Sequence, residues 1–201
     1  MWEENKNFNV DKELHIQGFD SKRSDSNQLS KIVQKKVIEM IMNNSEKDEI
    51  VEYLRNMDQA MRERKFSDEV IGIPKGITKE IINYNPPWPI HKGVVYSNKY
   101  FNTNFGKGSK PKFVWIKKVE KHPNNVKMTI RKKTGEIIIK EYPIEAIAYN
   151  TTIPKEVVID WNRMSNASFQ KKLENIFNAV GWAWQDLQTM SLESFFGGTN
   201  K

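Results

Sequence analysis

The residues of this chain with the clearest chemical character are cations that could contact phosphates, and no reaction centre accompanies them. They occur near the start, after a proline-rich segment, in a glycine-containing loop and late in the chain. The residues are Lys22, Arg23, His91, Lys92, Lys107, Lys110, Lys112, Lys171 and Lys172. Contacts of this kind position a nucleic-acid duplex without reading its sequence. Each of these side chains could instead be an ordinary exposed surface cation.

Patterns typical of catalysis or metal binding are missing from the sequence. The three His, at positions 15, 91 and 122, lie far apart, and none has a His or a carboxylate at metal-ligand spacing. Asp160 and Asp186 are isolated acids, and no carboxylate cluster that would hold paired Mg²⁺ ions is visible. We therefore expect no catalytic residue, no metal site and no cofactor in this chain.

The loop FGKGSK at 105–110 is the nearest approach to a phosphate-binding loop. It has two Gly and two Lys but lacks the Walker pattern. Either it contacts phosphates through its backbone N–H groups and lysines, or it is a plain flexible turn.

The last dozen residues, MSLESFFGGTNK, place Leu192 three and four residues before Phe195 and Phe196. Each aromatic side chain would gain about 1.5–3 kcal/mol on burial, so the pattern predicts a peptide that binds a groove on a partner. It resembles the short peptide by which replication proteins attach to a sliding clamp. Alternatively, the three side chains fold back onto their own domain.

Composition limits the class of protein. The chain has 201 residues, 38% hydrophobic and 11% aromatic, which predicts one globular domain or two small ones. It has no Cys, which excludes disulfides and thiolate metal sites. No apolar run approaches 18 residues and the start is polar, so neither a membrane span nor a secretory signal is expected.

The net charge of +7 is unevenly distributed. Residues 107–140 hold eleven Lys or Arg and two acids, a net +9 that leaves −2 for the remainder. A basic block on a nearly neutral body predicts a surface for a polyanion. The alternative is a solvated, lysine-rich sheet.

Apolar spacing predicts helices in the first and last thirds. One helix carries Leu29 through Ile41, capped by Ser26 or Asn27, and a capping box from Ser45 begins a second through Met61. The two are expected to form an antiparallel pair with their apolar stripes in the core. Later, Pro154 predicts a helix start, Ser165 or Asn166 caps a helix, and Gly181 ends it.

The middle of the chain predicts short pieces and then strands. Residues 66–89 are broken by proline, and 91–103 could be helical or extended. Alternation predicts strands at 113–119, 126–131 and from 137, with a turn at Thr134-Gly135, in one small antiparallel sheet that has a cationic side. The predicted fold class is α+β, mostly helical.

Taken in order, these segments resemble the C-terminal part of family B DNA polymerases, closest to the T-even phage type. LHIQGFDSKRSDSNQLSKIVQ is similar to the start of the thumb, and PWPIHKGVVYSN to the family's "HIRGVLTY" segment. The family's "IAWP…LPKEI…W…FQK…AGM" ending is similar to IAYNTTIPKEVVIDW and SFQKKLENIFNAVGW of this chain. The clamp-binding terminus of the family is similar to MSLESFFG. The resemblance runs from about residue 10 to the end.

The sequence also departs from this family pattern. The palm motifs, with the metal-binding aspartates and the primer-grip lysines, are absent from these residues. Ser26-Asn27 stands where Pro is expected, the late helix is about a turn shorter, and Thr189 replaces the Gln of consensus clamp peptides.

The resemblance implies the small thumb subunit of a split polymerase, and the Met start and the tail suggest a separately encoded chain. Residues 1–13 would be an arm that docks with the palm chain, 14–187 a thumb-like domain, and 188–201 a flexible clamp-binding tail. Trp2 and residues 14–20 would form the docking edge. The partners would be a large chain with exonuclease, fingers and palm, primer–template duplex DNA and a sliding clamp, with no membrane. Mg²⁺ would belong to the palm chain, and the location would be the (host) cytoplasm.

Three other functions fit the sequence. The first is an independent basic DNA-binding accessory protein that recruits the clamp. The second is a nuclease or other enzyme whose carboxylates gather only in the fold. The third is an interaction protein whose basic sheet meets an acidic partner. Salt dependence of DNA binding separates the first from the third, and Mg²⁺-dependent turnover would identify the second.

Overall fold

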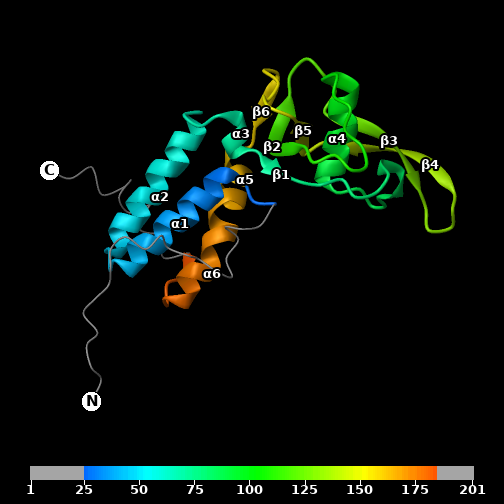
Figure 1. Ribbon diagram of the computed structural model, residues 1–201. Coiled ribbons are helices and arrows are strands. Elements are labelled where there is room, and N and C mark those ends of the chain that lie inside the picture. Colours follow the sequence, from blue (N-terminus) through cyan, green and yellow to red (C-terminus); the bar gives the residue numbers. More distant parts are fainter. Residues whose placement is uncertain (1–24, 185–201) are drawn as a thin grey trace, which may run out of the picture.

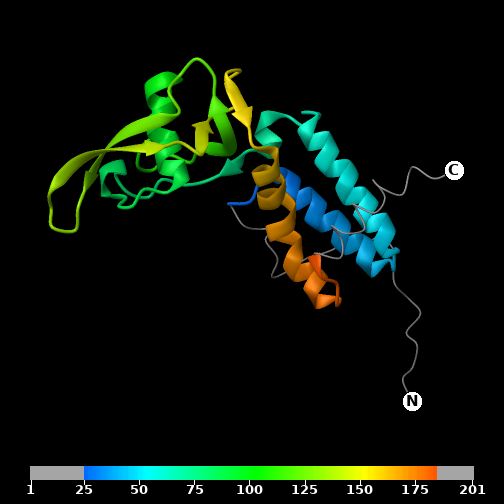
Figure 2. The ribbon, with the colours of Figure 1, turned by 180° about the vertical axis from the view of Figure 1, so that it is seen from behind.

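The structure is a computed structural model, and it describes residues 25–184. A group of helices lies at one end and the strands lie at the other (Figure 1). The helical part contains α1 (Gln28–Met42), α2 (Lys47–Arg62) and the late helix, which lie side by side from both directions of view (Figures 1 and 2). The α+β class predicted from the sequence is confirmed.

The first helix forms as its sequence predicts. Asn27 is its N-cap, and the side-chain oxygen accepts a hydrogen bond from the Ser30 backbone N–H at 2.7 Å. At the other end Asn44 takes a positive φ of 55°, and the Ser45 N–H donates to the Met40 carbonyl at 2.9 Å. Asn tolerates this left-handed conformation, which explains why α1 stops there.

The second helix begins without the predicted capping box. Glu46 is its N-cap and makes no side-chain capping bond. Asp48 and Glu49 lie in the first turn, where their charges oppose the positive end of the helix dipole. The predicted core stripe is confirmed, because Ile50 and Leu54 are buried against the rest of the helical part.

The late helix starts earlier than predicted and is continuous across three segments. Its parts are α5 (Trp161–Ser165), the π-helical turn η3 (Asn166–Gln170) and α6 (Lys171–Ala179). Asp160 caps it by accepting the Arg163 N–H at 3.1 Å, so the predicted cap at Ser165 or Asn166 is wrong. The predicted end is confirmed, because Gly181 has φ 76° and the Trp182 N–H donates to the Phe177 carbonyl at 2.9 Å.

Polar side chains tie α1 to the late helix inside the core. The Gln34 amide donates to the Lys172 carbonyl at 2.7 Å. The Asn27 amide donates to the Ile71 carbonyl at 2.9 Å and to the Ser168 hydroxyl at 2.8 Å. Asn27 therefore joins three segments that are far apart in the sequence.

Short elements connect the helical part to the strands, as predicted. They are α3 (Asp68–Ile71), β1 (Ile73–Pro74) and η2 (Ile81–Asn83). The next element, α4 (Pro89–Tyr100), settles the open question about residues 91–103 in favour of a helix that ends at Tyr100. Pro89 begins it, where proline's fixed φ suits a first turn.

The strands lie in two sheets, so the predicted single sheet is wrong. β2 (Lys112–Val119) pairs antiparallel with β1, β5 (Ala146–Tyr149) and β6 (Val157–Ile159). β3 (Asn125–Arg131) and β4 (Ile137–Pro143) pair only with each other, as a hairpin that projects from the body in both views (Figures 1 and 2). The turn predicted at Thr134-Gly135 is confirmed, with Gly135 at φ 88°.

Pro154 does not begin a helix. It lies in a turn in which the Val157 N–H donates to the Pro154 carbonyl at 3.1 Å, and the chain then enters β6. Residues 157–159 form a strand because they pair with β2, although the local preference of Pro154 favours the start of a helix. The predicted arm at 1–13, the docking edge with Trp2 and residues 14–20, and the tail at 188–201 lie outside the described residues.

Candidate nucleic-acid interface

Strand β3 of the hairpin places its apolar and its cationic side chains on opposite faces. Val126, Met128 and Ile130 are buried. Lys127 and Arg131 are exposed on the other face, where Lys127 lies opposite Glu141 and Arg131 lies opposite Ile137. The cationic side predicted for this strand is confirmed by the exposure pattern.

A bulge places two adjacent lysines of β2 in solvent. Ile116 pairs with Ile159 and Lys118 with Val158, so Lys117 is the extra residue in β2. Without such a bulge, neighbouring side chains would point to opposite faces. Lys118 pairs with Glu120 at 3.5 Å, whereas Lys117 has no ion pair within residues 25–184.

Most cations of the basic block are exposed and lack an acidic partner in the described part of the chain. They lie in the loop before β2, on β2, and along the hairpin and its turn. They are Lys107, Lys110, Lys117, Lys121, Lys127, Arg131, Lys133 and Lys140. Unpaired surface cations retain their full charge for a phosphate, so we define these eight residues as the basic surface.

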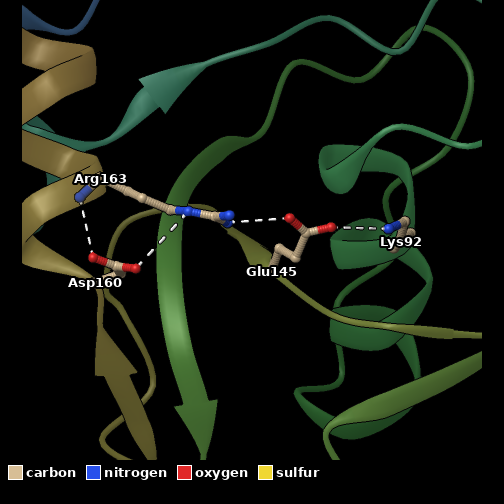
Figure 3. Close-up of polar contacts among 4 residues, drawn as sticks. All are labelled: Lys92, Glu145, Asp160 and Arg163. Atoms are coloured by element: carbon tan, nitrogen blue, oxygen red, sulfur yellow. Dashed lines mark hydrogen bonds and ion pairs between the residues drawn. The ribbon is translucent and has the colours of Figure 1, made fainter.

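The predicted phosphate contact Lys92 has a different role. Its side chain is 9% exposed, and Nζ lies 3.1 Å from Oε1 of Glu145. Figure 3 shows Glu145 between Lys92 and Arg163, and the Arg163 Nη1 reaches the other carboxylate oxygen at 3.1 Å. Arg163 also contacts Asp160, at 3.9 Å from Nε. Lys92 is thus part of a network that joins α4 to α5, and this geometry disfavours a phosphate contact.

The ionisation of Glu145 reflects the same network. Burial by itself would raise the pKa of this carboxyl, but hydrogen bonds and charge from Lys92 and Arg163 outweigh burial and hold the pKa below its ordinary value. Glu145 is therefore ionised at neutral pH and neutralises one of its two cations.

His91 is not a surface cation either. It is 5% exposed, its Nδ1 accepts the Trp88 backbone N–H at 3.1 Å, and its ring stacks on Tyr84 with centroids 3.4 Å apart. Burial, together with the charge of Lys75, lowers the pKa of His91 to about 4. At neutral pH it is an uncharged hydrogen-bonding group.

Three backbone N–H groups of the loop at 105–110 are already bonded and so cannot form the backbone cradle that was one of its two interpretations. The Gly106 N–H donates to the Ser109 hydroxyl at 3.1 Å, the Gly108 N–H to the Ile77 carbonyl at 2.7 Å, and the Ser109 N–H to the Gly106 carbonyl at 3.0 Å. The side chains of Lys107 and Lys110 are exposed and remain available to an anion.

The remaining predicted residues are dispersed. Lys112 pairs with Glu69 at 2.9 Å. Lys171 is exposed and Lys172 is half-buried, and both lie on α6 in the helical part, away from the hairpin (Figure 1). Lys22, Arg23, Leu192, Phe195 and Phe196 lie outside the described residues, so their predicted roles stay predictions.

Two lysines that sequence reasoning missed lie beside the loop. Lys75 and Lys79 border an open hollow of about 820 Å³ together with Lys110. Backbone bonds bring the segments together, since the Lys75 N–H donates to the Pro111 carbonyl at 3.0 Å and the Ile77 N–H to the Ser109 carbonyl at 2.9 Å. The spacing K-G-I-T-K was visible in the sequence, but it lies outside the basic block and nothing local links it to Lys110.

The described part of the chain holds no cluster of metal-binding side chains and no membrane-spanning helix. Between residues 25 and 184, no three His, Cys, Asp or Glu side chains gather to hold a metal ion. Over the same range, no helix has the length and apolar character needed to cross a bilayer.

Comparison with solved structures includes a distant likeness to a polymerase. No protein-family model and no curated protein matches the chain. The structure is similar to that of the family B DNA polymerase from the hyperthermophilic archaeon Pyrobaculum calidifontis, with a TM-score of 0.49 and 21% sequence identity. The match covers 74% of this chain and 17% of the polymerase chain, so this protein spans only a small part of that polymerase's length.

Proposed function

We propose that this chain is the thumb subunit of a split family B DNA polymerase and grips primer–template duplex behind the active site of a palm-bearing chain. The observation that carries the proposal is the basic surface, whose cations are exposed and unpaired among residues 25–184. The ordered resemblance of the sequence segments to the polymerase thumb supports the choice of family. Catalysis and its Mg²⁺ would belong to the partner chain.

Contacts through the basic surface would be independent of base sequence and sensitive to salt. Each Lys or Arg that neutralises a phosphate releases counterions and adds about −0.9 to the slope of log affinity against log salt. Lys127 and Arg131 lie four residues apart on the open face of β3, which corresponds to about 13 Å along a strand. They are the best-defined pair for a test because the strand fixes their spacing.

The first experiment measures duplex binding of the full chain at several salt concentrations by fluorescence anisotropy. The variant Lys127→Gln/Arg131→Gln should bind more weakly, and its salt slope should be shallower by about 2. The matched control is Lys35→Gln/Lys36→Gln, which removes the same charge from exposed positions on α1. Equal losses in both variants would show that net charge alone drives binding and would contradict a grip by the hairpin.

The second experiment tests the role in a polymerase. The chain alone should not extend a primer, and a mixture with a palm-bearing family B chain and a sliding clamp should. We propose that Leu192, Phe195 and Phe196 bind the clamp and raise the effective concentration of the polymerase on DNA. Phe195→Ala/Phe196→Ala should therefore shorten the products per binding event without changing extension in the absence of the clamp.

An independent DNA-binding accessory protein is the second candidate. The hairpin that projects from the body favours it, because a two-stranded ribbon fits a major groove about 12 Å wide (Figures 1 and 2). Salt-sensitive duplex binding with no effect on any polymerase would select this candidate over the thumb subunit.

A further inference from the structure

The hollow beside the first turn of α4 combines three features that a nucleotide requires. It is lined by residues of the segment 74–86, by Trp88, which is the N-cap of α4, by His91 of α4, and by Lys110. Its volume of about 820 Å³ lies within the range of about 300–1,000 Å³ typical of small-ligand sites. None of the duplex contacts proposed above requires it, apart from Lys110 at its rim.

The first feature is positive charge. Lys75, Lys79 and Lys110 line the hollow, and Asp25, 4.0 Å from Lys75, is the one acid that lines it among the described residues. Lys79 and Lys110 have no ion pair within residues 25–184. The hollow therefore carries net positive charge and favours an anion.

The second feature is an exposed aromatic ring on a fixed support. Trp88 is 61% exposed, although a Trp side chain is usually largely buried. Its ring lies nearly parallel to that of His91, at 27° with centroids 6.3 Å apart, and His91 stacks on Tyr84. The Tyr84 hydroxyl oxygen accepts the backbone N–H groups of Thr78 and Lys79, each at 3.0 Å. An exposed ring held in this way is a platform on which a base can stack.

The third feature is a hydrogen-bond donor in the wall of the hollow for which the described residues supply no acceptor. Because Nδ1 of His91 accepts the Trp88 N–H, the proton of the neutral ring is assigned to Nε2. No group among residues 25–184 accepts a hydrogen bond from this Nε2, and His91 is one of the residues that line the hollow. A phosphate or base oxygen there would satisfy the donor.

We propose that this hollow binds an unpaired nucleotide of a DNA strand, with the base on Trp88 and the phosphate between Lys75, Lys79 and Lys110. A strand suits the hollow better than a free nucleotide does, because the hollow is continuous with the hairpin of the basic surface. The Asn85 amide at its edge donates to the Arg131 carbonyl at 3.5 Å, and η2 packs against β3. This inference goes beyond the proposed duplex grip, and its choice of a strand over a free nucleotide rests on the same basic surface.

The test measures binding of a fluorescently labelled short oligothymidylate to the full chain by anisotropy, with thymidine monophosphate and inorganic phosphate as competitors. Trp88→Ala and Lys79→Gln should each weaken oligothymidylate binding at least five-fold, and Trp88→Phe, which keeps a ring, should restore most of it. Lys35→Gln, which also removes one exposed lysine charge, is the charge-matched control for the lysine variant. Duplex affinity, measured in parallel, should change less than two-fold in Trp88→Ala.

The outcomes separate this proposal from the duplex grip. Unchanged oligothymidylate affinity in Trp88→Ala and Lys79→Gln variants with native circular dichroism would overturn it. Equally tight binding of thymidine monophosphate or inorganic phosphate would overturn the assignment to a DNA strand. Loss of duplex binding in Lys127→Gln/Arg131→Gln with normal oligothymidylate binding would support a separate site.

Discussion

Asn27 is the residue whose replacement should most clearly reveal how the helical part is held together. It is 2% exposed, it caps α1, and it donates to Ile71 and to Ser168 on segments 44 and 141 residues away. Asn27→Ala removes all of these bonds and leaves buried polar groups in three elements without partners. Lys22 and Arg23, which the sequence predicts to contact phosphates, lie in the segment directly before Asn27.

The expected cost follows from the bonds that are lost. Loss of an N-cap costs about 1 kcal/mol. The buried Ile71 carbonyl and Ser168 hydroxyl lose their partner, at about 1 kcal/mol or more each. The free energy of unfolding should therefore fall by about 3 kcal/mol, a large share of the 5–15 kcal/mol typical of a domain. With a urea m-value of about 2 kcal/mol/M, the midpoint should fall by about 1.5 M.

Urea unfolding followed by circular dichroism measures this change. Asn27→Ser is the matched control, because a Ser hydroxyl can still cap α1 but is too short to replace the bonds to Ile71 and Ser168. It should cost about 1 kcal/mol less than Asn27→Ala. A loss below 1 kcal/mol for Asn27→Ala, or an Asn27→Ser variant as stable as the unsubstituted chain, would refute the argument that these long-range bonds stabilise the fold. Equal losses in both variants would refute only the contribution assigned to the cap.

Three further predictions concern packing, pH and charge. Gly93→Ala should lower the thermal midpoint, because a Cβ there would lie 2.6 Å from the backbone oxygen of Ala146. Overpacking of this kind costs about 1–3 kcal/mol. An unchanged midpoint would contradict the close approach of α4 to β5. Since the pKa of His91 in the folded state is about 4 and the unfolded value is 6.5, the unfolded state binds more protons between these values. The stability contributed by neutral His91 should therefore be complete above pH 6.5 and fall by up to about 3 kcal/mol as the pH drops to 4. Urea titrations at several pH values measure this loss, and His91→Gln should make the stability less dependent on pH. Lys92→Met should lower the free energy of unfolding and leave duplex affinity within two-fold of the unsubstituted chain. Lys127→Met should weaken duplex binding and leave the urea midpoint unchanged. The reverse pattern would contradict the roles assigned to these two lysines.

Local chemistry explains the elements that the sequence predicted well. A side-chain cap, a left-handed Asn and a helical apolar stripe all act within a few residues, so α1 could be delimited from its own sequence. Alternation located β3 and its cationic face for the same reason. The helix predicted from Pro154 failed because strand pairing with β2, more than 35 residues earlier, determines the conformation of residues 157–159.

The sequence by itself determined where the helices and strands lie in much of the chain, and that its cations concentrate in residues 107–140, because these properties depend on neighbouring residues. Only the tertiary structure decided which of these cations stay charged and exposed, and so could contact a phosphate. Lys92 and Lys112 are neutralised by carboxylates 53 and 43 residues away, and His91 loses its charge to burial. Lys75 and Lys79 join Lys110 around the hollow through backbone pairing between distant segments. Ion pairing and burial depend on distance in space, which spacing along the chain does not reveal.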